Sequence, residues 1–96
     1  MITAIVLVTA EVDRIPEVGQ AIADLDGVSE VYSVAGDVDL VAMVRVRRHE
    51  DLQDVIPGRL NKVDGVLATT THIAFQAYSR HDLEATFSLG LEEPAG

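Results

Sequence analysis

Two carboxylic acids stand one residue apart in the segment Gly36-Asp37-Val38-Asp39, directly before an apolar run. Such a pair can serve as general acid and base, hold a Ca²⁺ ion, or simply form a turn. Ca²⁺ takes about six to eight oxygen ligands, and the neighbouring sequence supplies too few. No nearby residue offers the partner that an acid-base catalyst needs, so ligand recognition and a turn remain as the two alternatives.

Alternating hydroxyl groups mark a second segment towards the C-terminus. Thr69 and Thr71 share one face of an expected strand with Ile73, and Thr70 and His72 share the opposite face. A hydroxyl at a subunit contact can hydrogen-bond the polar head of a ligand. Threonine is also favoured in strands because of its branched shape alone. A binding role and a structural role for Thr69 and Thr71 therefore both stay open.

The three histidines, His49, His72 and His81, are scattered along the chain, and there is no cysteine. None of them has a second metal-binding side chain four residues away, the spacing that would pair two ligands on one helix face. We therefore expect no metal site and no cofactor.

A basic cluster, Arg45, Arg47 and Arg48, follows an apolar run in an otherwise acidic chain. These guanidinium groups can pair with acids across an assembly or hold a carboxylate ligand. Charges at the end of a strand also keep a sheet edge in solvent, so the cluster alone does not define a site.

The composition describes one small acidic domain. Its 96 residues suffice for a single modest core. The 16 acids and 7 bases give a net charge of −9, which repels nucleic-acid phosphates and anionic lipid. No apolar run approaches the ~20 residues that span a bilayer, and residues 1–9 lack the basic start of a signal peptide. We expect a cytoplasmic protein that contacts neither nucleic acid nor membrane directly.

Hydrophobic periodicity predicts the elements that position these side chains. Residues 2–9 form a β-branched run, typical of a strand buried on both faces. A helix is expected over residues 13–27, where apolar residues recur every three or four positions. Asp13 is the expected N-cap of that helix, Pro16 fits its first turn, and Gly27 suits its left-handed end.

The remaining pattern predicts a hairpin, a second helix and a last strand. Residues 28–35 and 38–46 read as two strands joined by a tight turn at Gly36-Asp37. An apolar stripe over residues 49–65 predicts a helix, which Pro57-Gly58 must kink or divide into two short pieces. Residues 66–78 complete the order as a strand.

The same three residues follow both helices: Asp26-Gly27-Val28 and Asp64-Gly65-Val66, 38 positions apart. This repeat divides the chain into two βαβ halves. The order βαββαβ predicts an α+β fold, a ferredoxin-like sandwich with a four-stranded antiparallel sheet and two helices on one face.

The uncovered face of that sheet is predicted to be apolar. Ile5 and Leu7 alternate with another apolar set in the first strand, as do Val41 and Met43 in the third. Soluble monomers rarely expose so large an apolar patch. We therefore expect a two-fold dimer through the sheet, an α/β dimeric barrel.

The hairpin over residues 28–46 and the segment Val-Asp-Gly-Val-Leu-Ala-Thr-Thr-Thr-His-Ile-Ala-Phe over 63–75 resemble a known pattern. They resemble the effector-binding domain, or RAM domain, of the Lrp/AsnC (feast/famine) transcription regulators. That family has a Gly-x-Tyr-Asp turn between strands two and three, then a Gly-Val pair and a Thr-x-Thr strand. The resemblance spans residues 2–78 and implies a RAM domain over 1–79. A tail with a short helix, expected from Leu83, Phe87 and Leu91, would follow over 80–96.

The resemblance also implies ligand-binding residues: Gly36, Asp37, Val38, Asp39, Thr69 and Thr71. Gly36 with positive φ would expose backbone N–H groups to a carboxylate, and Asp39 would accept hydrogen bonds from an α-ammonium group. Val38 departs from the family, which commonly has Tyr there, so a stacking or hydroxyl contact would be lost.

For partners, the resemblance implies an amino acid or similar metabolite bound between dimers, and assembly of dimers into tetramers, octamers or hexadecamers. Family members carry an N-terminal helix-turn-helix, whereas this sequence begins at the first strand, so we expect a stand-alone, non-enzymatic domain. Such a domain would act on transcription through a partner, for example a full-length Lrp/AsnC regulator. Two alternatives remain: a small dimeric enzyme of monooxygenase or isomerase type, and a purely structural oligomerisation module.

Overall fold

The structure, a computed structural model, describes residues 1–80 and shows the predicted βαββαβ order. Its main elements are β1 (Ile2–Ala10), α1 (Ile15–Ala23), β2 (Val28–Ser33), β3 (Leu40–Val46), α2 (His49–Val55) and β4 (Val66–Ala74). Two 3-10 turns, Val12–Arg14 and Leu60–Lys62, complete them. The expected helix after residue 80, together with His81, lies outside the described residues.

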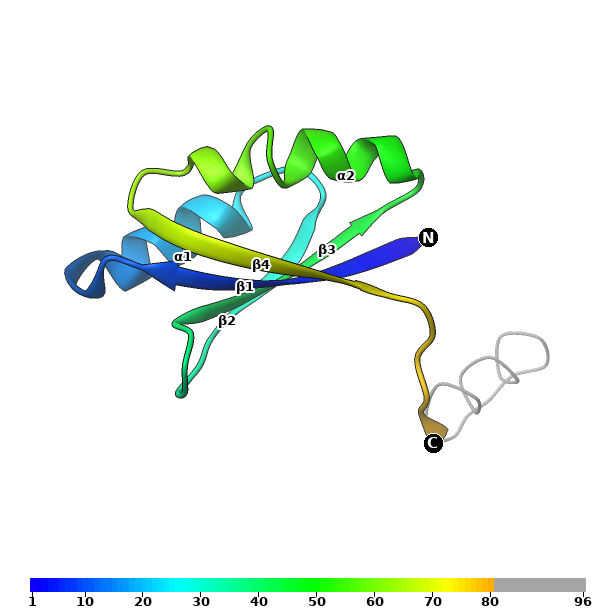
Figure 1. The fold of residues 1–96 in the computed structure, drawn as a ribbon, viewed down its shortest axis with the longest axis horizontal. Coiled ribbons are helices and arrows are strands. Elements are labelled where there is room, and N and C mark those ends of the chain that lie inside the picture. The colour runs from blue at the N-terminus through cyan, green and yellow to red at the C-terminus, as the bar shows by residue number, and fades with distance from the viewer. Residues whose placement is uncertain (81–96) are drawn as a thin grey trace.

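The four strands form one antiparallel sheet in the order β2-β3-β1-β4. Both helices lie on one side of this sheet (Figure 1). The prediction of a ferredoxin-like sandwich is therefore confirmed. Within residues 1–80, no helix combines the length and the apolar character needed to cross a membrane.

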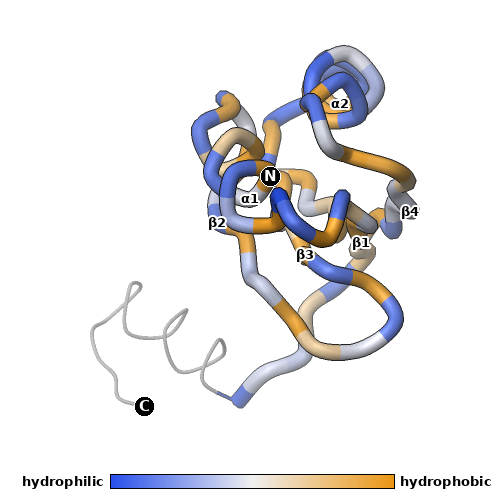
Figure 2. Tube along the Cα trace, turned by 90° about the vertical axis from the view of Figure 1, so that its left-hand side faces the viewer, coloured by the Kyte–Doolittle hydropathy of each residue, from blue (hydrophilic) through white to orange (hydrophobic). Residues whose placement is uncertain are grey.

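The core lies between the sheet and the helices and is aliphatic. Alternate residues of β1 and β3 are buried there: Ala4, Val6, Val8, Ala10, Leu40, Ala42, Val44 and Val46. The helical side supplies Val18, Ile22, Leu52, Val55, Ile56 and Leu60. Each fully buried Val, Leu or Ile contributes about 1.5–3 kcal/mol relative to exposure. Both helices carry hydrophilic as well as hydrophobic residues, so each buries only one side (Figure 2).

The other face of the sheet has no covering helix within residues 1–80. Ile5 and Leu7 of β1 and Val41 and Met43 of β3 lie on it, each half-buried by its neighbours. The expectation that β1 is buried on both faces therefore holds for only one face of a single chain.

The repeated glycines form two equivalent corners between the halves. Gly27 and Gly65 have φ of 93° and 96°, in the left-handed region. A Cβ atom on Gly27 would lie 2.7 Å from Val55 Cγ2 of α2, and one on Gly65 would lie 2.6 Å from Val18 Cγ2 of α1. Each corner thus packs tightly against the helix of the opposite half.

The proline in the second helix ends it rather than bending it. After α2 stops at Val55, a separate 3-10 turn begins at Leu60. Pro57 has no N–H to continue the helical ladder. Gly58 lies so close to the Asp54 carbonyl oxygen that a Cβ atom would be 2.4 Å from it. The broken pattern therefore produces two short pieces, which was one of the two predicted outcomes.

The predicted start of the first helix and the predicted end of the last strand were both wrong. Asp13 is not the N-cap of α1, because residues 12–14 form a 3-10 turn and Arg14 takes the cap position without a side-chain hydrogen bond. The last strand ends at Ala74 instead of residue 78. Ala74 pairs with Thr3, and this is the last pair between β4 and β1.

We predict that Gly27→Ala and Gly65→Ala each lower the free energy of unfolding by about 2–4 kcal/mol, from left-handed backbone strain and overpacking together. Urea denaturation measures the effect. Gly19→Ala is the matched control, since its Cβ would meet Leu40 Cδ2 at an ordinary 3.4 Å. Equal stability of all three variants would contradict the role assigned to the corners.

Candidate functional site

The loop between β2 and β3 is held in place by Asp39. The Asp39 N–H donates to the Val8 carbonyl at 2.9 Å, and the Asp39 Oδ2 atom accepts from the Ala10 N–H at 2.9 Å. A further bond joins the Val34 N–H to the Asp39 carbonyl at 3.1 Å. The predicted tight turn at Gly36-Asp37 is therefore wrong: the connection spans residues 34–39, because Asp39 turns to bond with β1.

The tip of this loop is exposed and glycine-based. Gly36 has φ of 139°, as the positive-φ prediction requires, and no atom lies within 4 Å of where its Cβ would be. Asp37 is exposed, and Val38 is half-buried. No hydrogen bond within the described part of the chain uses the N–H of Gly36 or Asp37, so both can donate to an external acceptor.

The two candidate threonines differ in their surroundings. Both face the helical side of the sheet, because Thr69 pairs with Val8 and Thr71 with Val6, whose side chains are buried there. The Thr69 hydroxyl donates to Asn61 Oδ1 at 2.7 Å. Thr71 instead lines an open groove.

This groove, which we call the α2–β4 groove, has a volume of about 340 Å³. Its apolar wall consists of Leu52, Ile56, Pro57 and Ile73. Its polar groups are the Thr71 hydroxyl, the His49 imidazole and the Gln53 amide. His49 and Gln53 are four residues apart, so they lie on the same face of α2. The sequence shows this four-residue spacing. It does not predict a metal site, because the second residue of the pair is Gln.

The loop and the α2–β4 groove flank β1 without meeting in one chain. Val8 pairs with Leu40, which follows the loop, on one side and with Thr69 on the other. The groove lining contains no residue of 34–39. The structure therefore brings Thr71 together with His49 and Gln53, and keeps Asp39 two strands away from them.

A polar cluster borders the open sheet face at β2. Glu30 accepts from the Tyr32 hydroxyl at 2.8 Å and from Arg45 Nη1 at 2.8 Å. These two bonds, first that from Tyr32 and then that from Arg45, hold the pKa of Glu30 below its ordinary value. The bond to Glu30 correspondingly raises the pKa of Tyr32.

The other members of the basic cluster lie at the exposed end of β3. Arg48 Nη2 lies 3.7 Å from Asp51 Oδ1. Arg47 lines a hollow of about 210 Å³ together with Asp26, Asp51, Asp54 and Arg59. Arg45 and Arg48 thus pair with acids of their own chain, an arrangement that differs from the suggested pairing across an assembly.

The histidines lie apart from one another. His72 pairs with Ile5 and lies on the open sheet face, whereas His49 lines the α2–β4 groove. Among residues 1–80, no group of three or more His, Cys, Asp or Glu side chains is arranged to hold a metal ion.

A groove that places a hydroxyl, an imidazole and an amide beside apolar side chains has the arrangement of a small-molecule site. The fold is that of a ferredoxin-like domain, and the groove has a mixed polar and apolar lining. The chain belongs to the Lrp/AsnC family: the model of the Lrp/AsnC ligand binding domain matches residues 3–83.

Two solved structures are similar to this chain. TTHA0845 from Thermus thermophilus is 48% identical, with a TM-score of 0.78 over 83% of this chain and 100% of that chain. The feast or famine regulatory protein Rv3291c from M. tuberculosis, solved with L-methionine, is 27% identical, with a TM-score of 0.65 over 83% of this chain and 54% of that one.

Among curated proteins, the HTH-type transcriptional regulator PH1692 of Pyrococcus horikoshii is 33% identical over 78% of this chain and 50% of its own length. The chain thus spans about half the length of the curated relatives that it matches. The family assignment gives the domain an effector-binding, regulatory role.

We predict that Asp39→Ala lowers the free energy of unfolding by about 1.5–3 kcal/mol, the contribution of a hydrogen bond to a charged group. Asp39→Asn keeps an oxygen acceptor for the Ala10 N–H and should lose less than about 1 kcal/mol. Hydrogen exchange at the Ala10 amide measures the anchor directly. Slow exchange at Ala10 in Asp39→Ala would show that the carboxylate does not hold the loop.

Proposed function

We propose that this domain binds an amino acid, or a similar small metabolite, with an apolar side chain. The observation that carries the proposal is the position of Thr71 in the α2–β4 groove beside His49 and Gln53. The L-methionine complex of the related M. tuberculosis regulator supports the ligand class.

The chemistry of the groove suits such a ligand. The imidazole of His49, the amide of Gln53 and the hydroxyl of Thr71 can all donate hydrogen bonds to a carboxylate. The apolar wall, to which Leu52 and Ile56 belong, suits an aliphatic or thioether side chain.

The loop between β2 and β3 supplies further hydrogen-bonding groups for the proposed ligand. Its free N–H groups at Gly36 and Asp37 can also hold a carboxylate. Asp39 uses Oδ2 for its anchor to Ala10 and keeps Oδ1 as an acceptor for an ammonium group. Because the loop and the groove are separated within one chain, we propose that a ligand bridges the loop of one copy and the groove of another. Val38 supplies only an apolar contact there.

The open sheet face supports assembly. We propose that two copies pack through Ile5, Leu7, Val41 and Met43, since these half-buried apolar residues form a continuous patch across β1 and β3. Assembly of such dimers into tetramers or octamers would bring the loops to the grooves.

The regulatory output is proposed to pass to DNA through a helix-turn-helix module or a full-length Lrp/AsnC partner in the cytoplasm. The matched curated relatives are HTH-type regulators of about twice the matched length. The net charge of −9 makes direct contact between this domain and nucleic acid unfavourable.

The proposed site predicts that an apolar amino acid raises the melting temperature, because a ligand bound only by the native state stabilises it. A thermal-shift screen with the twenty amino acids tests this. Thr71→Val should weaken binding about fivefold, the effect of one lost hydrogen bond of about 1 kcal/mol. Thr70→Val, on the opposite face of β4, is the matched control. No shift with any amino acid, or equal losses in both variants, would contradict the proposed site.

The proposed dimer predicts that Met43→Glu yields monomers, because two carboxylates would be buried at the interface without partners. Light scattering measures the assembly state. Ala21→Glu adds the same charge on the exposed surface of α1 and should leave association intact. Unchanged association of the Met43→Glu protein would exclude the sheet face as the interface.

A further inference from the structure

A second groove lies between α1 and β2, on the side of the sheet that the helices cover. This groove, which we call the α1–β2 groove, has a volume of about 300 Å³. None of the described residues that line it carries a charge, and none of them lines the α2–β4 groove. The two grooves are therefore separate within the described chain.

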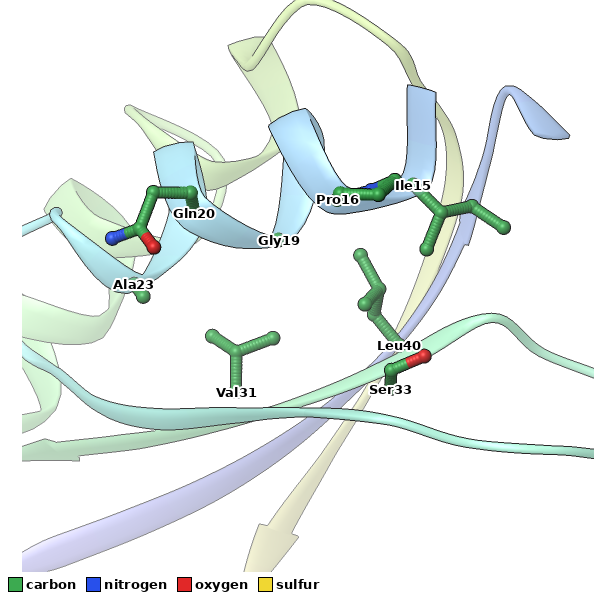
Figure 3. Close-up of a pocket in the computed structure, with 8 residues that line it drawn as sticks. All are labelled: Ile15, Pro16, Gly19, Gln20, Ala23, Val31, Ser33 and Leu40. Atoms are coloured by element: carbon green, nitrogen blue, oxygen red, sulfur yellow. The ribbon is translucent and has the colours of Figure 1, made fainter. Parts of the chain in front are cut away.

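The interior of the α1–β2 groove is apolar. Its apolar lining consists of Ile15, Pro16, Gly19, Ala23, Val31 and Leu40. Val31 and Leu40 point up from the strands towards α1, opposite Gly19 and Ala23 (Figure 3). Because Gly19 has no side chain and Ala23 has only a methyl group, space remains between the helix and the strands. An apolar lining of this kind suits the hydrocarbon part of a small ligand.

The polar group on the helical side of the groove is the amide of Gln20. Its Nε2 atom donates to Asp24 Oδ1 at 3.0 Å. This bond sets the direction of the amide: the nitrogen points away from the groove, and Oε1 lies on the groove side (Figure 3). An amide oxygen accepts hydrogen bonds and cannot donate them. The helical side of the groove thus presents an acceptor to a ligand.

A carboxylate stands beside this acceptor. Asp24 follows Ala23 at the end of α1 and is exposed. Within residues 1–80, no hydrogen bond or ion pair uses its Oδ2 atom. Residues 11–30 carry six acids and one base, Arg14, which is already paired with Asp64 at 2.8 Å. The border of the groove therefore attracts a cation and repels an anion.

We propose that the α1–β2 groove is a second ligand site, which binds a primary amine with an apolar chain and no carboxylate. The chain lies between Gly19 and Val31, and the ammonium group donates to Gln20 Oε1 and Asp24 Oδ2. Such an ammonium group is charged at neutral pH, as the lysine side chain is. The site shares no residue with the proposed amino acid site and does not depend on it.

Nuclear magnetic resonance titration with phenethylamine tests the position and the chemistry of the site. The backbone amide signals of Gly19 and Ser33, which line the groove, should shift, whereas that of Thr71 should not. Phenethyl alcohol has a hydroxyl group in place of the ammonium group, and phenylacetate has a carboxylate. We expect the amine to bind at least about tenfold more tightly than either, because hydrogen bonds between charged groups are the stronger ones. Equal affinities for the amine and the alcohol, or an unchanged Gly19 signal, would overturn the proposal.

Two pairs of variants separate the apolar and the charged contributions. Ala23→Leu fills the groove and should abolish binding, whereas Ala21→Leu, at an exposed position of α1 outside the lining, should not. Asp24→Asn keeps an oxygen for Gln20 and should weaken binding about fivefold. Glu17→Gln removes the same charge from an exposed position of α1 outside the lining and should leave the affinity unchanged. Circular dichroism confirms that each variant is folded, and equal losses within either pair would contradict the proposed site.

Discussion

The close approach of each glycine corner to the helix of the opposite half holds the two βαβ units together. At Gly27 the chain must turn with positive φ while Val55 of α2 occupies the space of a side chain, and Gly65 meets Val18 in the same way. The carbonyl groups at these corners also accept hydrogen bonds. The Gly27 carbonyl accepts from the Arg45 N–H and the Gly65 carbonyl accepts from the Glu11 N–H, both at 2.9 Å. The repeat is therefore a packing requirement at two points of the fold.

The same repeat accounts for two grooves in one small domain. The α1–β2 groove and the α2–β4 groove occupy corresponding positions in the two halves, and the shift of 38 residues that relates Gly27 to Gly65 also relates Ser33 to Thr71. The linings have diverged: the second half places His49 and Gln53 at its groove, whereas the first has an apolar helix surface with Gly19 and Ala23. The two grooves therefore differ in the polar groups that they present.

The sequence predicted the fold well because burial follows periodicity. The alternation in residues 2–9 and 40–46 and the stripes of both helices indicated the buried set, and the repeated Asp-Gly-Val indicated the two halves. The errors arose where a long-range contact decides local structure. Asp39 widens the hairpin because its backbone and side chain bond to β1. β4 ends at Ala74, where its pairing with β1 ends at Thr3, and no local pattern reports that limit.

The candidate site shows the same division between local and long-range causes. The resemblance to the Lrp/AsnC family pointed to Gly36 and Thr71, whereas the partners of Thr71 depend on how α2 packs beside β4. Asp39 has a local role in the loop and a long-range contact with β1. Its Oδ2 atom holds the loop to Ala10, so the turn interpretation and the binding interpretation of the two acids do not exclude each other. A carboxylate already fixed by one hydrogen bond presents its second oxygen in a defined direction, and such preorganisation lowers the entropy lost when a ligand binds. The anchor that makes Asp39 structural is therefore also what would make it an effective acceptor for an ammonium group.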